Sequence, residues 1–373
     1  MNLRRAFTLI EMLVVIIIIT SILLIAVPSF QSMLNNSQAA LADTMLKSGL
    51  RSGKDAALRS SGDQDSAVVF FFAPGGRLTM GIYIKAGSLN DLDGAGNVVR
   101  RDIFVPSGIN EPLQLPRGWM VRGYAPANST SDGSNDSTSD PATQWYEPYP
   151  NRPKNANEPN WVFPETDFYD RSRSDVGEYR QTFMVRFQAG TGIMKMGSAE
   201  TCLIFAPGPN AQWRNNGVFA NYRADQTDDA LRFVTRILNA PAGGGGPTVV
   251  TDANRRELLG WKSSDMVLTR AVGQLALYDE SKLAAALGVR VDRFSQSLYL
   301  PFDPGSPAPP SLPPRPSNFA SYSRDINRWI SGDTNLDGLH RPNGAAGEVL
   351  DAPEARIFTV DRYTGALQAV EVQ

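Results

Sequence analysis

The stretch that decides the fold runs from Arg4 to Leu34 and reads Arg4-Arg5-Ala6-Phe7-Thr8-Leu9-Ile10-Glu11, then MLVVIIIITSILLIAVPSFQSML. Between Leu13 and Val27 every side chain is aliphatic except Thr20 and Ser21. With the apolar residues just upstream, the run reaches the roughly 20 residues that cross about 30 Å of hydrocarbon. Backbone groups find no water there, so the run must be helical, and the two hydroxyls can bond back to helix carbonyls.

Glu11 does not suit a plain membrane anchor. A carboxylate costs on the order of 2.5–3.5 kcal/mol at mid-membrane, so its position near the start of the run indicates a partner charge. A cleaved secretory signal fits poorly, because its apolar core is about 7–15 residues and ends at a small-residue site. Here the core is longer and leads into Val27-Pro28-Ser29-Phe30. An uncleaved anchor explains the length and the Arg4-Arg5 flank but not the glutamate.

The order Ala6-Phe7-Thr8-Leu9-Ile10-Glu11 resembles the processing site of type IV prepilins and type II secretion pseudopilins. In that family a prepilin peptidase cuts on the cytoplasmic side, between a small residue and Phe, and methylates the new N-terminus. The resemblance implies cleavage between Ala6 and Phe7, N-methylation of Phe7, and a role in assembly for Glu11. Pro28 falls where the family carries a proline that kinks its helix. Ala6 replaces the usual glycine, and we expect slower processing.

The chemistry of this arrangement supports a role for Glu11 in assembly. Cleavage leaves an ammonium group beside hydrocarbon, and a carboxylate four residues later can neutralise the same amine on a neighbouring, axially staggered subunit. An unpaired charge in low dielectric is costly, and a pair is much less so. The alternative is that the Glu11 side chain only extends to the cytoplasmic interface.

The basic flank predicts the topology. Arg4 and Arg5 hold the N-terminus in the cytoplasm by the positive-inside rule. We therefore expect a leader at 1–6, a transmembrane helix in the inner membrane at 7–28, an amphipathic continuation at 29–62 and an exported, periplasmic head at 63–373. A helix from Thr8 to Ser61 would be roughly 80 Å long. Its apolar stripe has two adjacent sides: one is formed by Leu34, Gln38, Leu41, Met45, Gly49 and Ser52, and the other by Leu46, Leu50, Gly53 and Ala57.

The order of elements predicts an α+β head with a mainly antiparallel sheet. Its strand-turn-strand units resemble those in the heads of H-class minor pseudopilins. We expect strands at 67–73, 77–87, 98–105, 118–124, 179–187, 201–205, 355–360 and 366–372. Turns are expected at Pro74-Gly75-Gly76, at 90–94 and at Gly190-Thr191-Gly192, after which 201–205 would pair back on 179–187. Short helices are expected at 228–238, with Leu231, Val234 and Leu238 on one side, and at 279–287. Low-complexity insertions lie near 125–160, 241–247 and 303–318.

Composition argues against several function classes. Lys and Arg total 36 against 38 Asp and Glu, so there is no broad electrostatic case for nucleic acid. The single cysteine, Cys202, excludes an intrachain disulfide and reads as a small core residue. The single histidine, His340, leaves little room for a His-based site, and no P-loop, dinucleotide fingerprint or zinc spacing is present. We expect no enzymatic activity and no catalytic residues.

Calcium is the one cofactor that the sequence suggests. Asp333-Thr334-Asn335-Leu336-Asp337-Gly338 has side-chain oxygens at alternate positions and glycine sixth, so Asp333, Asn335 and Asp337 are candidate ligands. The twelfth position is Gly344, where a bidentate acid is needed. Such residues also build plain turns, and both interpretations stay open.

Two functions of different class remain. The first is a pilin-like structural subunit, minor pilin or pseudopilin, of a type IV pilus or type II secretion pseudopilus. Its partners would be prepilin peptidase, other pilins or pseudopilins, the inner-membrane assembly platform and the lipid bilayer. The second is a single-pass, membrane-anchored binding module or hydrolase that enters no filament.

Overall fold

The chain divides into two compact units, Met1–Thr44 and Met45–Gln373. The computed structural model describes residues 9–73, 77–92, 98–108, 111–124, 181–195, 202–205, 230–240, 251–252, 254–255, 259, 266–286, 329–330 and 355–370. The predicted insertions and the calcium candidates Asp333, Asn335 and Asp337 lie outside these ranges.

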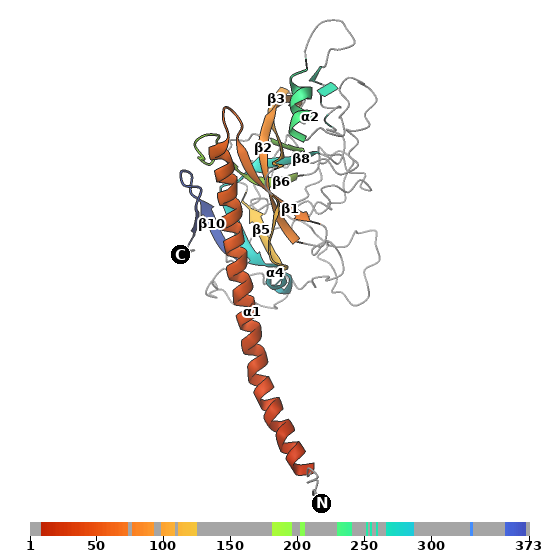
Figure 1. Ribbon diagram of the computed structural model, residues 1–373, viewed down its shortest axis with the longest axis vertical. Coiled ribbons are helices and arrows are strands. Elements are labelled where there is room, and N and C mark those ends of the chain that lie inside the picture. The colour runs from red at the N-terminus through yellow and green to blue at the C-terminus, as the bar shows by residue number, and fades with distance from the viewer. Residues whose placement is uncertain are drawn as a thin grey trace, which may run out of the picture. The chain divides into compact units, whose positions relative to one another are not determined.

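A single helix, α1 (Leu9–Arg59), opens the described chain and confirms the long helix predicted from the sequence (Figure 1). It continues through Pro28, which has no backbone N–H to donate. The predicted back-bonding is present, since Thr20 Oγ1 donates to the Ile16 carbonyl at 2.9 Å and Ser21 Oγ to the Ile17 carbonyl at 2.8 Å. Polar side chains are thereby satisfied within the apolar helix.

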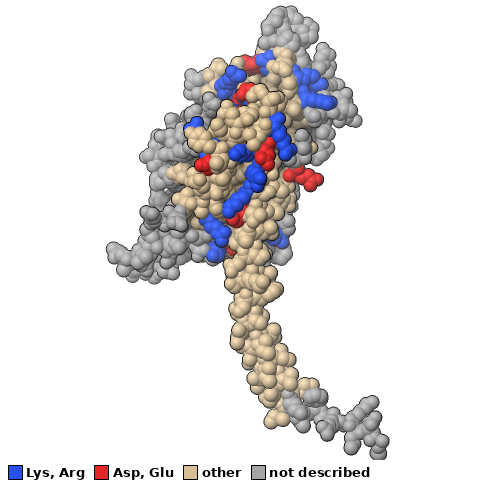
Figure 2. Space-filling view, turned by 60° about the vertical axis from the view of Figure 1, so that its left-hand side comes forward, with Lys and Arg blue, Asp and Glu red and all other residues tan. Residues whose placement is uncertain are grey.

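The N-terminal half of α1 presents an apolar surface from Met12 to Val27, which only the hydroxyls of Thr20 and Ser21 interrupt. Its described side chains are exposed, with Leu24 and Ile25 each 75% accessible. Figure 2 shows this half without blue or red atoms, whereas charged side chains are scattered over the head. Among the residues that the structure describes, this is the one helix long and apolar enough, by length and composition, to cross a membrane.

A seven-stranded sheet forms the centre of the second unit, in the order β1-β6-β8-β7-β3-β2-β4. Because β1 also pairs with β2, the first six strands close into a barrel. Its strands are β1 (Ser66–Ala73), β2 (Arg77–Leu92), β3 (Val98–Pro106), β4 (Leu113–Gln114), β6 (Gln181–Phe187), β7 (Cys202–Phe205) and β8 (Met266–Ala271). The α+β class is confirmed, but two parallel pairs, β3–β7 and β6–β8, and the closure were not predicted.

The barrel interior is apolar. Its core combines side chains from every strand of the ring: Ala67, Val69, Phe71, Tyr83, Phe104, Met184, Cys202 and Ile204, with Ala271 packed against them. Cys202 is 2% exposed, which confirms its prediction as a core residue. Alternate residues of each strand face this core, as the period of two requires.

Two local predictions in this sheet were wrong. The turn expected at 90–94 is still strand at Asn90, Asp91 and Leu92, because these residues pair with 98–100 of β3. The strand expected to pair back on β6 is β7, which lies between β3 and β8. All four residues of β7 are buried, as is typical of a central strand rather than one arm of a surface hairpin.

Helix α2 (Ala230–Leu238) covers the outer face of β2, β3 and β7. The buried side chains are Phe233, Val234 and Ile237, so the face predicted from Leu231, Val234 and Leu238 was only partly correct. The Phe233 ring stacks on Phe205 with a centroid distance of 6.0 Å. An aromatic ring buries more apolar area than a leucine side chain, so the face of α2 that includes Phe233 packs against the sheet.

A second, fully antiparallel sheet has the order β11-β10-β9-β5, with β5 (Trp119–Gly123), β9 (Gln274–Asp279), β10 (Arg356–Val360) and β11 (Leu367–Ala369). The predicted C-terminal hairpin is confirmed as β10–β11, but it belongs to this sheet and not to the barrel. Helix α4 (Glu280–Ala286) confirms the helix predicted at 279–287, but the strand β9 that it follows directly was not predicted.

The part of α1 that lies in the second unit packs on the outside of the barrel. One side of the predicted stripe, Leu46, Leu50, Gly53 and Ala57, is buried. On the other side Gly49 is buried, whereas Leu34 and Leu41 are exposed. Gly53 allows the closest approach: the Ser66 hydroxyl of β1 donates to its carbonyl at 2.5 Å. A Cβ on Gly53 would overlap Val68 Cγ2 of β1.

This contact predicts opposite results for two glycines one turn apart. Gly53→Ala should lower the free energy of unfolding by about 1–3 kcal/mol, because Val68 is fully buried and stiff at χ1. Gly49→Ala, the matched control, should be neutral or stabilising, because its Cβ meets the flexible end of the Met80 side chain, and Leu113 Cδ1 only at an ordinary contact distance of 3.7 Å, while helix propensity improves by about 1 kcal/mol. Chemical denaturation of the detergent-solubilised protein measures both. Equal effects of the two substitutions would contradict this packing.

Candidate functional site

The first candidate site is the N-terminal segment. Ala6 and Phe7, the predicted processing and methylation residues, precede the described chain. Glu11 lies in α1 two residues after the helix begins, and Pro28 lies inside the same helix. The backbone therefore carries Glu11 on the apolar helix, as the assembly hypothesis requires.

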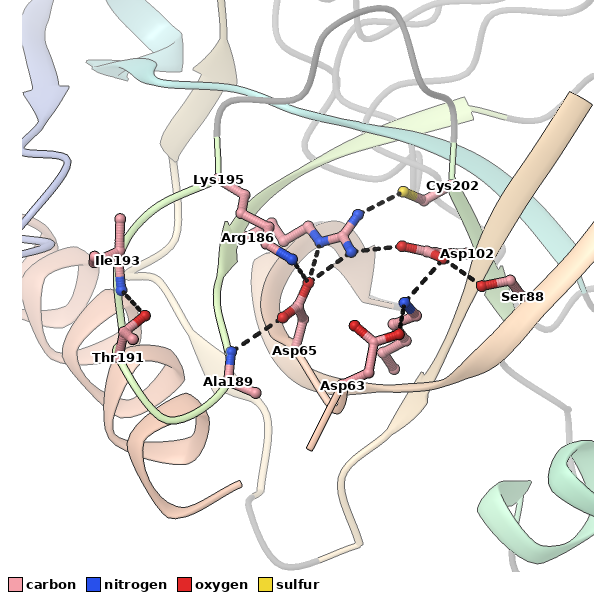
Figure 3. Close-up of polar contacts among 11 residues, drawn as sticks. Asp63, Asp65, Ser88, Asp102, Arg186, Ala189, Thr191, Ile193, Lys195 and Cys202 are labelled. Carbon is pink, nitrogen blue, oxygen red and sulfur yellow. Dashed lines mark hydrogen bonds and ion pairs between the residues drawn. The ribbon is translucent and has the colours of Figure 1, made fainter. Parts of the chain in front are cut away.

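The second candidate site is a cluster of charges at one end of the barrel interior, shown in Figure 3. The carboxylate of Asp65, which is 1% exposed, is its hub. Asp65 Oδ2 accepts hydrogen bonds from Arg186 Nε at 2.9 Å, Arg186 Nη2 at 2.6 Å and Lys195 Nζ at 2.7 Å. Asp65 Oδ1 accepts one from the Ala189 backbone N–H at 3.0 Å.

Asp102 extends the same network to β2. Its Oδ2 accepts from Arg186 Nη2 at 2.5 Å, and its Oδ1 accepts from the Ser88 hydroxyl at 2.6 Å. Lys85 Nζ lies 3.1 Å from Asp102 Oδ1 and 2.5 Å from Asp63 Oδ2. The cluster thus holds three carboxylates (Asp63, Asp65, Asp102) and three cations (Lys85, Arg186, Lys195), which alternate.

Arg186 also contacts the barrel core. Its Nη1 donates to Cys202 Sγ at 3.6 Å, and its guanidinium carbon lies 5.2 Å from the centroid of the Phe104 ring. The cation is therefore shared between two carboxylates, a thiol and an aromatic face. A planar guanidinium with several donors suits such a junction better than an ammonium group does.

The pairing keeps these groups charged. Burial alone would raise the pKa of Asp65, but hydrogen bonds from Lys195, Ala189 and Arg186 hold it below the ordinary value. Burial likewise opposes ionisation of Asp102, yet Ser88, Arg186 and Lys85 lower its pKa. The pKa of Lys85 is raised, because Asp63 and Asp102 outweigh its burial. The cluster is thus electrically balanced at neutral pH.

Strand alternation explains where the cluster forms. Asp65, Lys85, Asp102 and Arg186 each lie two residues from a side chain of the barrel core, namely Ala67, Tyr83, Phe104 and Met184. They are therefore the next inward positions on four strands and meet at one end. This cluster was not predicted from the sequence: a charge next to an apolar alternation is visible, but its partners are up to 130 residues away. The donors and acceptors of the cluster form hydrogen bonds with one another, which favours a structural role for it.

A third group of polar side chains lies in the second sheet. Arg122 Nε donates to the Tyr278 hydroxyl at 2.8 Å, and both residues are buried. Glu280, at the start of α4, is 1% exposed. Its burial, and to a lesser extent Asp279, raise the pKa of Glu280 to about 8, although Arg122 acts in the opposite direction.

This raised pKa predicts a stability that falls with increasing pH. The folded state holds the Glu280 proton up to about pH 8, whereas the unfolded chain releases it near pH 4.5. The stability that this proton contributes is therefore fully present below pH 4.5, and it is lost progressively as the pH rises from there through 8. Glu280→Gln should therefore stabilise the protein by about 1–3 kcal/mol at pH 9 and have little effect at pH 4.5. Thermal melts at both pH values test this, and an equal shift at both would contradict it.

Comparison with known proteins identifies the first site. A family model described as the prokaryotic N-terminal methylation motif matches residues 1–27. No curated protein and no solved structure matched the chain. The chain therefore carries this motif at the N-terminal end of a long apolar helix. By length and composition this helix is of the membrane-anchor type. Motif and helix together are consistent with a type IV pilin-like or pseudopilin-like protein.

Proposed function

We propose that the chain is a minor pilin or pseudopilin, a structural subunit of a type IV pilus or type II secretion pseudopilus. The observation that carries this proposal is the methylation motif at residues 1–27, joined to a helix that continues without interruption to Arg59. A membrane anchor alone needs about 20 residues. The further length of α1, packed on a β-rich head, suits a subunit that links a head to a filament core.

The proposal specifies processing and location. Prepilin peptidase removes residues 1–6 and methylates Phe7, and the mature chain waits in the inner membrane with its N-terminus cytoplasmic and its head periplasmic. The assembly platform then adds it to other pilins or pseudopilins. The apolar surface of α1 exchanges lipid for neighbouring helices, so little apolar area is exposed to water at any stage.

In this proposal the head is not an enzyme. The charged groups of the Asp65 cluster pair with one another, and their pKa values keep the Asp65 and Asp102 carboxylates ionised. Among the residues with a described structure, no group of three or more His, Cys, Asp or Glu could hold a metal ion. The head would act through its surface, by contact with cargo or with other subunits.

The decisive experiment is intact-mass and N-terminal peptide spectrometry of the protein purified from its native membrane. The expected N-terminus is methylated Phe7, with residues 1–6 absent. A chain that retains Met1 through Ala6 would instead support the alternative, a tethered exported domain outside any filament. The same preparation, cross-linked before extraction, should contain other pilin-like subunits.

A further inference from the structure

The connection between α1 and β1 is held to the barrel chiefly by the charge cluster. Residues 61–64 are exposed, and Gly62 turns the chain with a φ of +69°. After this turn, Asp63 pairs with Lys85, and Asp65 pairs with Arg186 and Lys195. The Lys85 backbone N–H donates to the Asp65 carbonyl at 2.8 Å. The junction is thus anchored by ion pairs rather than by apolar packing.

The cluster and the rest of the barrel respond to acid differently. Three carboxylates balance three cations at neutral pH. Protonation of Asp65 and Asp102 would leave Arg186 and Lys195 close together without their counter-charges, which is unfavourable in a buried place. The barrel core below them is apolar, and its ring of strands is closed by backbone hydrogen bonds that do not titrate.

We propose that this cluster is an acid-sensitive lock: protonation of Asp65 and Asp102 releases residues 60–65 from the end of the barrel while the barrel itself stays folded. The groups that face these carboxylates come from each neighbouring element. They are Lys85 and Ser88 on β2, Arg186 on β6, and Ala189 and Lys195 in the segment after β6.

The direction of the pH dependence follows from the native pairing. Both carboxyls have pKa values below the ordinary 3.8, so their contribution is fully present above that value and is lost as the pH falls through the native pKa.

Hydrogen exchange of the full-length protein in detergent, from pH 7 to pH 2.5, tests the lock. Protection relative to unstructured peptides should fall by at least about tenfold at Lys85 and Ala189, whose amides donate to Asp65, while the amides of 67–71 in β1 and 79–83 in β2, farther along the same pairing, keep theirs.

Two variants sharpen the test. Lys195→Gln removes a half-exposed donor to Asp65 and should shift the release to higher pH. Asp252→Asn breaks a more exposed pair with Arg255 outside the cluster and should leave the transition unchanged. The lock is wrong if Lys85 and Ala189 stay protected to pH 2.5, or if residues 67–71 and 79–83 of the β1–β2 pairing lose protection together with them, since that would be global acid unfolding.

Discussion

Glu11→Ala is expected to leave the protein in the membrane and to reduce its recovery in sheared filaments about a hundredfold. The mature N-terminal ammonium of the neighbouring subunit would then lie unpaired beside hydrocarbon, at a cost on the order of 2.5–3.5 kcal/mol per subunit contact. Quantitative immunoblots of membrane and filament fractions measure both quantities. Apolar anchoring itself should not change, because the rest of α1 is intact.

Two companion variants separate charge from shape. Glu11→Gln keeps the size of the side chain and removes its charge, so it should fail as Glu11→Ala does. Thr20→Ala alters a polar residue of the same apolar run, whose hydroxyl bonds only within the helix, and should assemble normally. Recovery of Glu11→Gln at wild-type levels would remove the electrostatic basis of the proposed assembly.

Arg186→Met is expected to lower the free energy of unfolding of the head by about 3–5 kcal/mol. The substitution leaves Asp65, which is 1% exposed, with a single cationic partner, and breaking a buried pair from one side leaves an uncompensated charge. Denaturant titration of the full chain in detergent, followed by circular dichroism, gives the loss. Arg51→Met, on the exposed face of α1, is the control and should stay within about 0.5 kcal/mol.

The pH dependence of the same variant tests its cause. Without Arg186 the carboxyls of Asp65 and Asp102 protonate more easily, so wild type and variant should converge in stability as the pH falls below 3.8. A loss of equal size at pH 7 and pH 3 would mean that packing against Phe104 and Cys202, rather than charge, is what Arg186 supplies.

Several elements could be predicted from sequence because their signals are local. The long helix follows from an apolar run and a stripe at spacings of three and four, and α1 ends two residues before the expected limit at Ser61. The β1–β2 hairpin follows from two β-rich runs around Pro74-Gly75-Gly76, and its register places Ala73 opposite Arg77. The methylation motif is likewise a contiguous string of residues.

The errors share a physical cause, which is pairing between distant segments. β7 was assigned to its neighbour in sequence, yet it pairs with β3 and β8. The buried face of α2 depends on Phe205, which belongs to another element. Alternation shows which residues of a strand share a face, but not which strand lies beside it.

By itself, then, the sequence determined the membrane-type helix, its processing motif, the position of Glu11 and the α+β class, since each depends on the order of nearby residues. Only the tertiary structure decided that the strands close into a barrel and that Asp65, Asp102 and Arg186 meet at its end. Their partners come from strands far apart along the chain, and the low cost of burying them exists only after the barrel has brought opposite charges together.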